Sequence, residues 1–509
     1  MKRRGAISRV GLLFLVSLAL LAGLVAWMAW EGRARTTTNS SADPLVVYCA
    51  AGIKIPFEEA AREYEQAYGV AVQAQFGGSG TQLSNAEASH IGDLFMPVDD
   101  SYIQLARKKG LLDEALPLAT THPVLAVRKG NPKGLHSLDD VLRPDVKLAQ
   151  ANPDAAGIGK LTKAALEKAG LWEKVKGQVA VFKPTVNDVA NDVKIGSVDG
   201  GFVWDTTVQL YPELMAVEIP AFNGVETKIT VGVLKSSKQP AAALRFARYL
   251  AARDKGLKAF ERHGFHVVEG DLWSDAPEIR LLAGAMLRPA IEETISAFEQ
   301  REGCRVTRVY NGCGILVAQM KAGERPDAYF ACDSSFMRQV NDLFLDQAEV
   351  STNRLVIVVP KGNPHAISTL KDLTKPGVRV GVGHEKQCAL GALTQKTFDQ
   401  SGLREAVSPN IVVQSPTGDM LVNALRTGSL DAVVAYVSNT TTAKNEVETI
   451  PIDVPCAIAT QPLAVGRESK QKYITGRLLE ALESKQSKDR FESQGFAWTL
   501  GARETTVAK

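Results

Sequence analysis

This chain of 509 residues contains an internal repeat, and the repeat limits the folds that it can adopt. The segment Gly78-Ser79-Gly80 returns as Gly312-Cys313-Gly314, 234 residues later, and Gly264-Phe265 returns as Gly495-Phe496, 231 residues later. Other matches at offsets of 231 to 234 include three pairs of aspartates: Asp93 and Asp327, Asp99 and Asp333, Asp199 and Asp431. A nearly constant offset indicates a duplicated structural unit. We therefore expect a starting segment at 1–44, a first module at 45–270 and a second module at 278–509.

Short apolar strands alternate with amphipathic helices inside each module. The first module shows expected strands at 45–50, 70–76 and 200–204, with expected helices at 56–68 and 155–169. Hydrophobic residues make up 45% of the chain and charged residues 23%, which is typical of a globular protein. Such alternation predicts an α/β fold with a largely parallel sheet, in which ligands bind where strands end and helices begin.

The N-terminal segment differs from the rest of the chain. An uncharged run, Val10–Trp30, follows four basic residues: Lys2, Arg3, Arg4 and Arg9. A run of this length can cross a bilayer as a helix, and the basic residues hold its start in the cytoplasm. A cleaved signal peptide is the alternative, but Trp27 and Trp30 occupy the region where a cleavage site would lie. We expect a single-pass membrane anchor, a short polar linker, and two extracytoplasmic modules.

Several ordered segments of both modules are similar to those of a known family. In the first module they are the turn at 48–53, the Ser-rich loop at 77–81, and the segments 92–99, 152–157 and 201–204. In this order they resemble the molybdate-binding proteins of ABC importers, which have the type II periplasmic-binding-protein fold. The resemblance implies two lobes per module, with the first lobe at 45–122 plus 235–270 and the second at 123–234. It also implies an importer permease as partner.

The first module is expected to bind a small oxyanion such as molybdate or tungstate. The resemblance assigns five ligand positions: Gly52, Ser79, Val98, Ala156 and Trp204. Backbone N–H groups at helix starts favour negative charge, glycine lets the backbone approach closely, and serine adds a hydroxyl donor. Trp204 stands where the family usually has tyrosine. The alternative is that these residues only form tight turns.

The second module has different chemistry at the matching positions: Met286, Cys313, Cys332, Cys388 and Tyr436. Three thiols with a nearby methionine would suit a soft metal ion such as copper or zinc. The alternatives are a disulfide, inert buried thiols, or a retained oxyanion site. Closely grouped sulfurs are expected for both a Cys313–Cys332 disulfide and a thiol-ligated metal.

Other sequence features exclude several functions. The net charge is +3 and the sequence contains no long basic block, so no nucleic-acid partner is expected. The seven histidines form no metalloprotease pattern, and His263 and His266 are expected to be surface or packing residues. We expect no enzyme, no catalytic residues and no cofactor. The main hypothesis is oxyanion binding for ABC-type import; the alternative is a membrane-anchored sensor or scaffold with one binding cleft.

Overall fold

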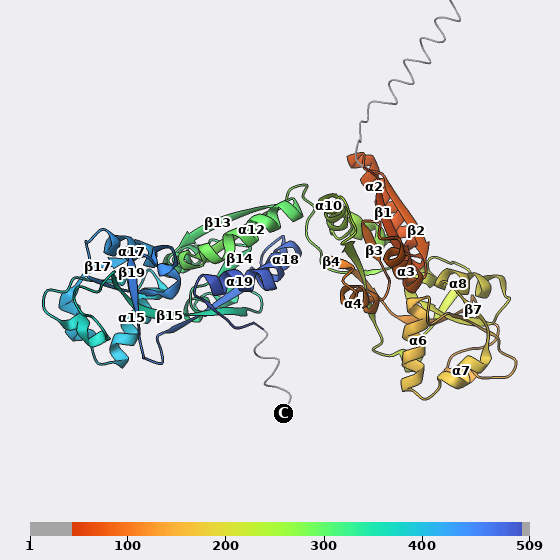
Figure 1. The fold of residues 1–509 in the computed structure, drawn as a ribbon. Coiled ribbons are helices and arrows are strands. Elements are labelled where there is room, and N and C mark those ends of the chain that lie inside the picture. The colour runs from red at the N-terminus through yellow and green to blue at the C-terminus, as the bar shows by residue number, and fades with distance from the viewer. Residues whose placement is uncertain (1–42, 501–509) are drawn as a thin grey trace, which may run out of the picture.

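The computed structural model describes residues 43–500, which form two modules of two lobes each (Figure 1). The expected anchor at Val10–Trp30 lies outside the described residues. None of the helices within 43–500 is both long and apolar enough to cross a membrane. Each module has a mixed α/β fold, and we name the lobes 1A, 1B, 2A and 2B in chain order.

Lobe 1A contains a six-stranded sheet in the order β11-β4-β10-β3-β1-β2. Its strands are β1 (Leu45–Ala50), β2 (Val72–Gly77), β3 (Leu94–Met96), β4 (Leu112–Thr121), β10 (Thr227–Leu234) and β11 (His266–Val267). Its helices are η1 (Ala51–Ile53), α2 (Lys54–Tyr68), α3 (Ser79–Ser89), α4 (Asp100–Lys108), α10 (Pro240–Leu250) and α11 (Gly256–Arg262).

Lobe 1B contains a five-stranded sheet in the order β7-β6-β8-β5-β9. Its strands are β5 (Pro123–Arg128), β6 (Leu148–Ala151), β7 (Val179–Lys183), β8 (Gly200–Trp204) and β9 (Leu214–Val217). Its helices are α5 (Leu138–Val141), α6 (Gly157–Lys168), α7 (Trp172–Gln178), α8 (Val186–Ile195), α9 (Asp205–Gln209) and η2 (Pro220–Phe222).

The second module repeats this order. Lobe 2A has β12 (Glu278–Gly284), η3 (Ala285–Leu287), α12 (Arg288–Glu302), β13 (Arg305–Asn311), α13 (Cys313–Lys321), β14 (Ala328–Phe330), α14 (Ser334–Met337), η4 (Asn341–Leu343), β20 (Ile458–Val465), α18 (Lys472–Leu482), α19 (Lys485–Ser493) and β21 (Ala497–Trp498). Lobe 2B has η5 (Leu370–Thr374), β16 (Val380–Gly383), α15 (Ala389–Gln400), α16 (Arg404–Val407), η6 (Ser408–Asn410), β17 (Ile411–Ser415), α17 (Gly418–Arg426), β18 (Ala432–Tyr436), η7 (Val437–Ala443) and β19 (Val447–Pro451). Strand β15 (Ala348–Pro360) is shared by both lobes.

The repeated aspartates explain why both copies fold alike. Asp93 accepts the Val46 backbone N–H at 2.8 Å, and Asp327 accepts the matching N–H of Arg280 at 2.8 Å. The other two pairs behave in the same way. Asp99 and Asp333 cap α4 and α14, and Asp199 and Asp431 accept the N–H groups of Lys147 and Arg379. These carboxylates satisfy backbone donors at strand and helix ends, and their role is structural.

The sheets are mixed rather than largely parallel, which corrects the sequence-based expectation. Strand β10 pairs antiparallel with both β3 and β4, so Thr227–Leu234 belongs to lobe 1A. The second lobe of the first module therefore ends before residue 227, not at 234. A buried apolar strand can belong to either lobe, and only its long-range pairing decides which.

The crossing strands differ between the modules. In the first module His122 separates β4 of lobe 1A from β5 of lobe 1B. In the second module β15 runs uninterrupted through both lobes, pairing with β20 in lobe 2A and with β18 in lobe 2B. The chain therefore passes from lobe 1A to lobe 1B at a break between two strands, whereas it passes from lobe 2A to lobe 2B within one continuous strand.

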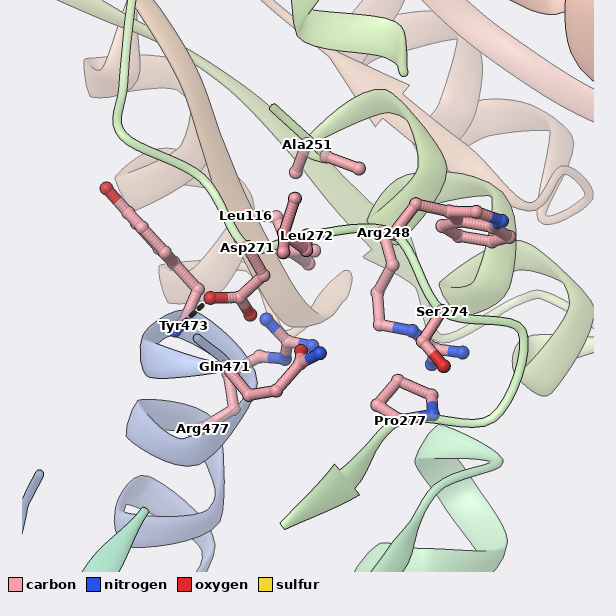
Figure 2. A pocket seen from close by; sticks show the side chains of 12 residues that line it. Leu116, Arg248, Ala251, Asp271, Leu272, Ser274, Pro277, Gln471, Tyr473 and Arg477 are labelled. Atoms are coloured by element: carbon pink, nitrogen blue, oxygen red, sulfur yellow. Dashed lines mark hydrogen bonds between the residues drawn. The ribbon is translucent and has the colours of Figure 1, made fainter. Parts of the chain in front are cut away.

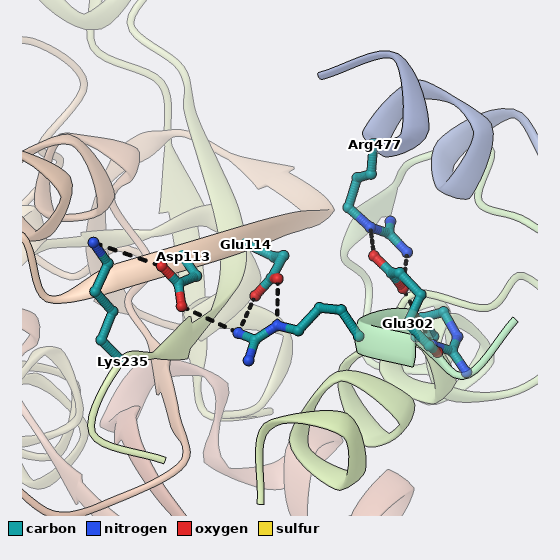
Figure 3. A network of polar contacts seen from close by, with 7 residues as sticks. Asp113, Glu114, Lys235, Glu302 and Arg477 are labelled. Carbon is teal, nitrogen blue, oxygen red and sulfur yellow. Dashed lines mark hydrogen bonds and ion pairs between the residues drawn. The ribbon is translucent and has the colours of Figure 1, made fainter. Parts of the chain in front are cut away.

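Lobes 1A and 2A pack against each other at the centre of the molecule, with α10 against α12, and lobes 1B and 2B lie at the two ends (Figure 1). Figure 3 shows the polar network at this interface. The buried Glu302 carboxylate accepts from Arg477 at 2.7 and 3.0 Å and pairs with Arg248 of the first module at 3.2 Å. Nearby, Arg301 bonds Glu114 at 2.7 and 2.8 Å.

A second contact joins the modules beside this network (Figure 2). Asp271, in the connection between the modules, accepts the backbone N–H groups of Tyr473 and Ile474 at 2.9 Å each. These groups lie in the first turn of α18, where a carboxylate satisfies free donors and complements the helix dipole. The connection is therefore fixed to the second module.

Candidate functional site

All five residues expected in the first cleft line a single cavity between lobes 1A and 1B, with about 240 Å³ of empty space that is continuous with solvent. Lobe 1A contributes Gly52, Ser79 and Val98, and lobe 1B contributes Ala156 and Trp204. Ser79 and Trp204 are only 3% and 2% exposed. The structure brings these positions together, and their roles toward a ligand remain a proposal.

Four helix starts meet at this cavity. Its lining includes Ser79, Gly157 and Val186, which are the first residues of α3, α6 and α8, and Gly52 of η1, which leads into α2. The first N–H groups of a helix have no acceptor within that helix, and the helix dipole makes its N-terminus electropositive. The cavity is therefore bordered by backbone donors from both lobes.

The cavity lining contains no charged side chain. The Ser79 hydroxyl oxygen accepts the Val98 N–H at 3.4 Å, which leaves the hydroxyl hydrogen available for donation. Neutral dipoles on both sides of a small cavity suit an anion, and the one lining hydroxyl already bonded to a carboxylate is that of Thr185, which donates to Asp188 at 2.6 Å.

The two lobes of the first module are closed over the cavity. The N–H of Gly80 donates to the Ala155 carbonyl at 2.9 Å, and the Asn187 amide donates to the Ala51 carbonyl at 3.0 Å. Gly78 allows this closure: a Cβ atom there would lie 2.3 Å from the Ala155 oxygen and 2.8 Å from the Pro184 oxygen. Any side chain at Gly78 would therefore hold the lobes apart.

The lining also includes a segment that the sequence analysis did not single out, Thr185 and Val186 at the start of α8. Thr185 caps this helix by accepting the Asp188 N–H at 3.2 Å. The repeat held a signal for them, since Thr417 lies 232 residues after Thr185 and also precedes a helix.

The second cavity is similar in size, about 260 Å³, but differs in its lining. Met286, Cys332 and Tyr436 line it, whereas Cys313 and Cys388 do not. Met286 occupies the position of Gly52. A Cβ atom added to Gly52 would lie 3.1 Å from the Val186 side chain. The second module has Gly418 in place of Val186, so the larger methionine side chain is accommodated.

Cys332 lines this second cavity, and Cys313 and Cys388 lie next to its lining residues. The sulfurs of Cys313 and Cys332 are 2.6 Å apart, and an added Cβ at Gly312 would lie 3.1 Å from Cys388 Cβ. All six cysteines are free thiols. Burial raises the pKa of Cys388 to about 11, and the pKa of Cys332 is also raised, chiefly by its bond with Cys313 and by burial. Both thiols are therefore protonated near neutral pH.

Cys313, Cys332 and Cys388 do not place their three sulfurs in one closely spaced group, and a soft-metal site there stays a prediction. Within residues 43–500, one group of three His, Cys, Asp or Glu side chains has its ligand atoms within 4.8 Å of one another, and it contains no cysteine. The Cys388 sulfur is instead directed toward the carbonyl oxygens of His384 and Ser415, at 3.6 and 3.5 Å. The spacing of the cysteines in the sequence predicted that the three thiols lie in one region, but it could not predict the direction in which each sulfur points.

The second cavity also has a carboxylate close by. Asn439, which lines it, donates to Asp419 at 2.8 Å, and burial raises the pKa of Asp419. The Tyr436 hydroxyl is buried and has no hydrogen-bond partner among the described residues. A methionine and a thiol line this cavity where the first has Gly52 and Val98, so it is less suited to an oxyanion than the first.

Comparison with known proteins also divides the chain into the two repeated modules. The profile of the family described as "Bacterial extracellular solute-binding protein" matches twice, at residues 45–266 and 279–497. A binding protein of Haemophilus influenzae is 27% identical over 231 residues, covering 45% of this chain and 94% of its own length. The molybdate-binding protein ModA of Mycobacterium tuberculosis H37Rv is 27% identical over 260 residues, covering 49% and 95%. The periplasmic molybdate-binding protein of Azotobacter vinelandii, a solved structure, is 18% identical with a TM-score of 0.39, covering 44% and 100%.

Proposed function

The chain belongs to the bacterial extracellular solute-binding protein family, which comprises binding proteins rather than enzymes, and from this premise we propose that it binds a small oxyanion for ABC-type import. Molybdate and tungstate are the proposed ligands, and the first cleft is the proposed site. A molybdate-binding relative that aligns with about half of this chain supports this choice.

The observation that carries the proposal is the meeting of four helix starts at an uncharged cavity. A tetrahedral oxyanion needs several donors directed at it from different sides, and backbone N–H groups of both lobes meet that need. The ligand would contact both lobes at once, so its binding favours the closed state by hinge motion.

The second cleft has a different part in this proposal. The Ser79 hydroxyl is replaced by the Cys313 thiol, which is a weaker donor, and Gly52 is replaced by the bulkier Met286. We propose that the first cleft alone takes up the oxyanion and that the second module acts chiefly as a scaffold. The proposal therefore joins the main hypothesis, oxyanion binding for import, with the single binding cleft of the alternative hypothesis.

Replacing Ser79 by Ala should weaken oxyanion binding by about 1 kcal/mol or more, because a hydrogen bond to a charged group is lost. Molybdate should raise the melting temperature of the unaltered protein, since a ligand that binds only the folded state stabilises it by mass action. Melting curves of both proteins, with molybdate, tungstate and sulfate in turn, measure the effect.

The repeat provides a matched control for this experiment. Cys313 occupies the position of Ser79 in the second module, so Cys313→Ala should leave the molybdate effect unchanged. No stabilisation by any of the three anions in the unaltered protein would contradict oxyanion binding. A loss of the effect in Cys313→Ala but not in Ser79→Ala would instead assign the ligand to the second cleft.

We also propose, from the sequence alone, that Val10–Trp30 anchors the protein in the cell membrane with both modules outside. The protein should then remain with membranes after a sodium carbonate wash, because a spanning helix is not released by high pH. Immunoblots of the washed membranes measure this. A mature N-terminus between residues 31 and 44 would show cleavage and refute the anchor.

A further inference from the structure

Two histidines and an aspartate meet at the crossing between lobes 1A and 1B, away from the cavity lining. The ligand atoms of His122, Asp205 and His266 all lie within 4.8 Å of one another. Asp205 Oδ2 is 3.4 Å from His122 Nδ1 and 3.5 Å from His266 Nε2. The sequence alone suggested no role for His266 beyond packing or surface exposure.

These distances match the coordination of a small divalent ion. A tetrahedral zinc ion with bonds of about 2.0–2.1 Å places its ligand atoms about 3.3–3.4 Å apart. The two distances from the carboxylate oxygen to the imidazole nitrogens therefore match this spacing, and all three ligand atoms lie within 4.8 Å of one another. Imidazole and carboxylate are ligands that Zn²⁺, Cu²⁺ and Ni²⁺ accept, whereas Ca²⁺ and Mg²⁺ prefer oxygen alone.

The surrounding bonds hold the aspartate in position. Asp205 Oδ1 accepts from the Thr121 hydroxyl and, at 3.1 Å, from the His122 backbone N–H, while the Asp205 N–H donates to the His122 carbonyl at 3.0 Å. Because Oδ1 is occupied, Oδ2 is left facing the two rings. The other nitrogen of His122, Nε2, lies 3.4 Å from Glu218, the kind of carboxylate contact that orients metal-binding histidines.

The second module shows that the fold does not need this group. The strand pairings align Pro123 with Leu355 and Trp204 with Tyr436, which places Arg354 and Val437 at the positions of His122 and Asp205. Ala497 pairs with Thr352 as His266 pairs with Thr120, so alanine occupies the third position. The same scaffold therefore forms with none of the three ligands.

We propose that His122, Asp205 and His266 form a binding site for one divalent transition-metal ion, of which Zn²⁺ is the best match. His266 belongs to lobe 1A, Asp205 begins the first helix after β8 in lobe 1B, and His122 joins the two lobes. A bound ion links both lobes at their crossing and restrains the angle between them. Asp205 also directly follows Trp204, which lines the cavity.

Zinc titration of the full-length protein, after treatment with a chelator, tests the site. Isothermal titration calorimetry should show one zinc ion bound per chain. The variants His122→Arg, Asp205→Val and His266→Ala introduce residues that the second module already has at these positions, and each should weaken zinc binding by at least about 100-fold. Glu218→Gln should weaken it by about 10-fold, as expected for a contact that only orients a ligand.

Two controls separate this site from other zinc ligands. His263 pairs with Glu59 at 2.8 Å outside the group, so His263→Ala should bind zinc as the unaltered protein does. The triple variant Cys313→Ser, Cys332→Ser, Cys388→Ser should also retain it. With Co²⁺ as the probe, a visible spectrum without a thiolate charge-transfer band is expected. Zinc binding that persists in His266→Ala and Asp205→Val, or that disappears with the cysteines, would overturn the proposal, as would no binding at all.

Discussion

Replacing Glu302 by Gln should lower the free energy of unfolding of the protein by about 3–5 kcal/mol, because it leaves two buried guanidinium groups without a counter-charge. Glu302 is 1% exposed, and it pairs with Arg248 and Arg477, which are 8% and 9% exposed. Burial lowers the pKa of Arg248, as expected for a cation that is removed from water. Urea unfolding followed by tryptophan fluorescence measures the loss, and Trp273 lies at this interface.

A second variant distinguishes unpaired charge from lost packing. In the triple variant Arg248→Met, Glu302→Leu, Arg477→Met, no charge remains buried, and stability should return close to that of the unaltered protein or exceed it. The Glu293 to Arg490 pair provides the exposed control, since Glu293 is 75% exposed. Glu293→Gln should leave the unfolding midpoint unchanged. A Glu302→Gln protein as stable as this control would show that the triad contributes nothing.

Replacing Gly78 by Ala should weaken oxyanion binding in the first cleft by at least about 100-fold, which corresponds to about 2.7 kcal/mol. The added Cβ would meet the carbonyl oxygens of Ala155 and Pro184, both backbone atoms of lobe 1B. Backbone cannot move aside as a flexible side chain can, so the lobes cannot close on the ligand. Isothermal titration calorimetry with molybdate measures the loss. Circular dichroism should show unchanged secondary structure, because the clash exists only in the closed state.

The second module again supplies the matched control. A Cβ at Gly312 would lie 2.4 Å from the Gln387 oxygen and 2.7 Å from the Pro416 oxygen, the same obstruction in the other cleft. Gly312→Ala should therefore leave molybdate affinity unchanged if only the first cleft binds. Equal losses in both variants would show that both clefts take the anion, and normal affinity in Gly78→Ala would remove the first cleft as the site.

Much of the fold could be predicted because its signals are local or repeated. The expected strands at 45–50 and 200–204 have the bounds of β1 and β8, and the expected helix at 56–68 lies within α2. The lobe of Thr227–Leu234 was predicted incorrectly, because it depends on pairing with β4, about a hundred residues earlier in the chain. The interface between the modules could not be predicted, because nothing in the sequence distinguishes an arginine that becomes buried from one that stays on the surface.

The candidate site was predictable in position but not in detail. All five first-cleft residues line one cavity, because they follow or end strands of the two sheets, three in lobe 1A and two in lobe 1B, and the two lobes meet there. In the second cleft, Cys332 lines the cavity and Cys388 points elsewhere, since side-chain direction depends on neighbouring backbone carbonyls. The group of His122, Asp205 and His266 was missed because its members are far apart in the sequence and follow no motif.

The buried Glu302 has a consequence for how a duplicated gene can evolve. Arg248 of the first copy depends on this carboxylate from the second copy, so deleting the second copy would expose the first to a loss of stability. Purifying selection would then preserve α12 and α18 whatever the second cleft binds. Its cleft loops would escape that constraint, so the second copy can keep its scaffold while Met286 and Cys313 stand where the first copy has Gly52 and Ser79.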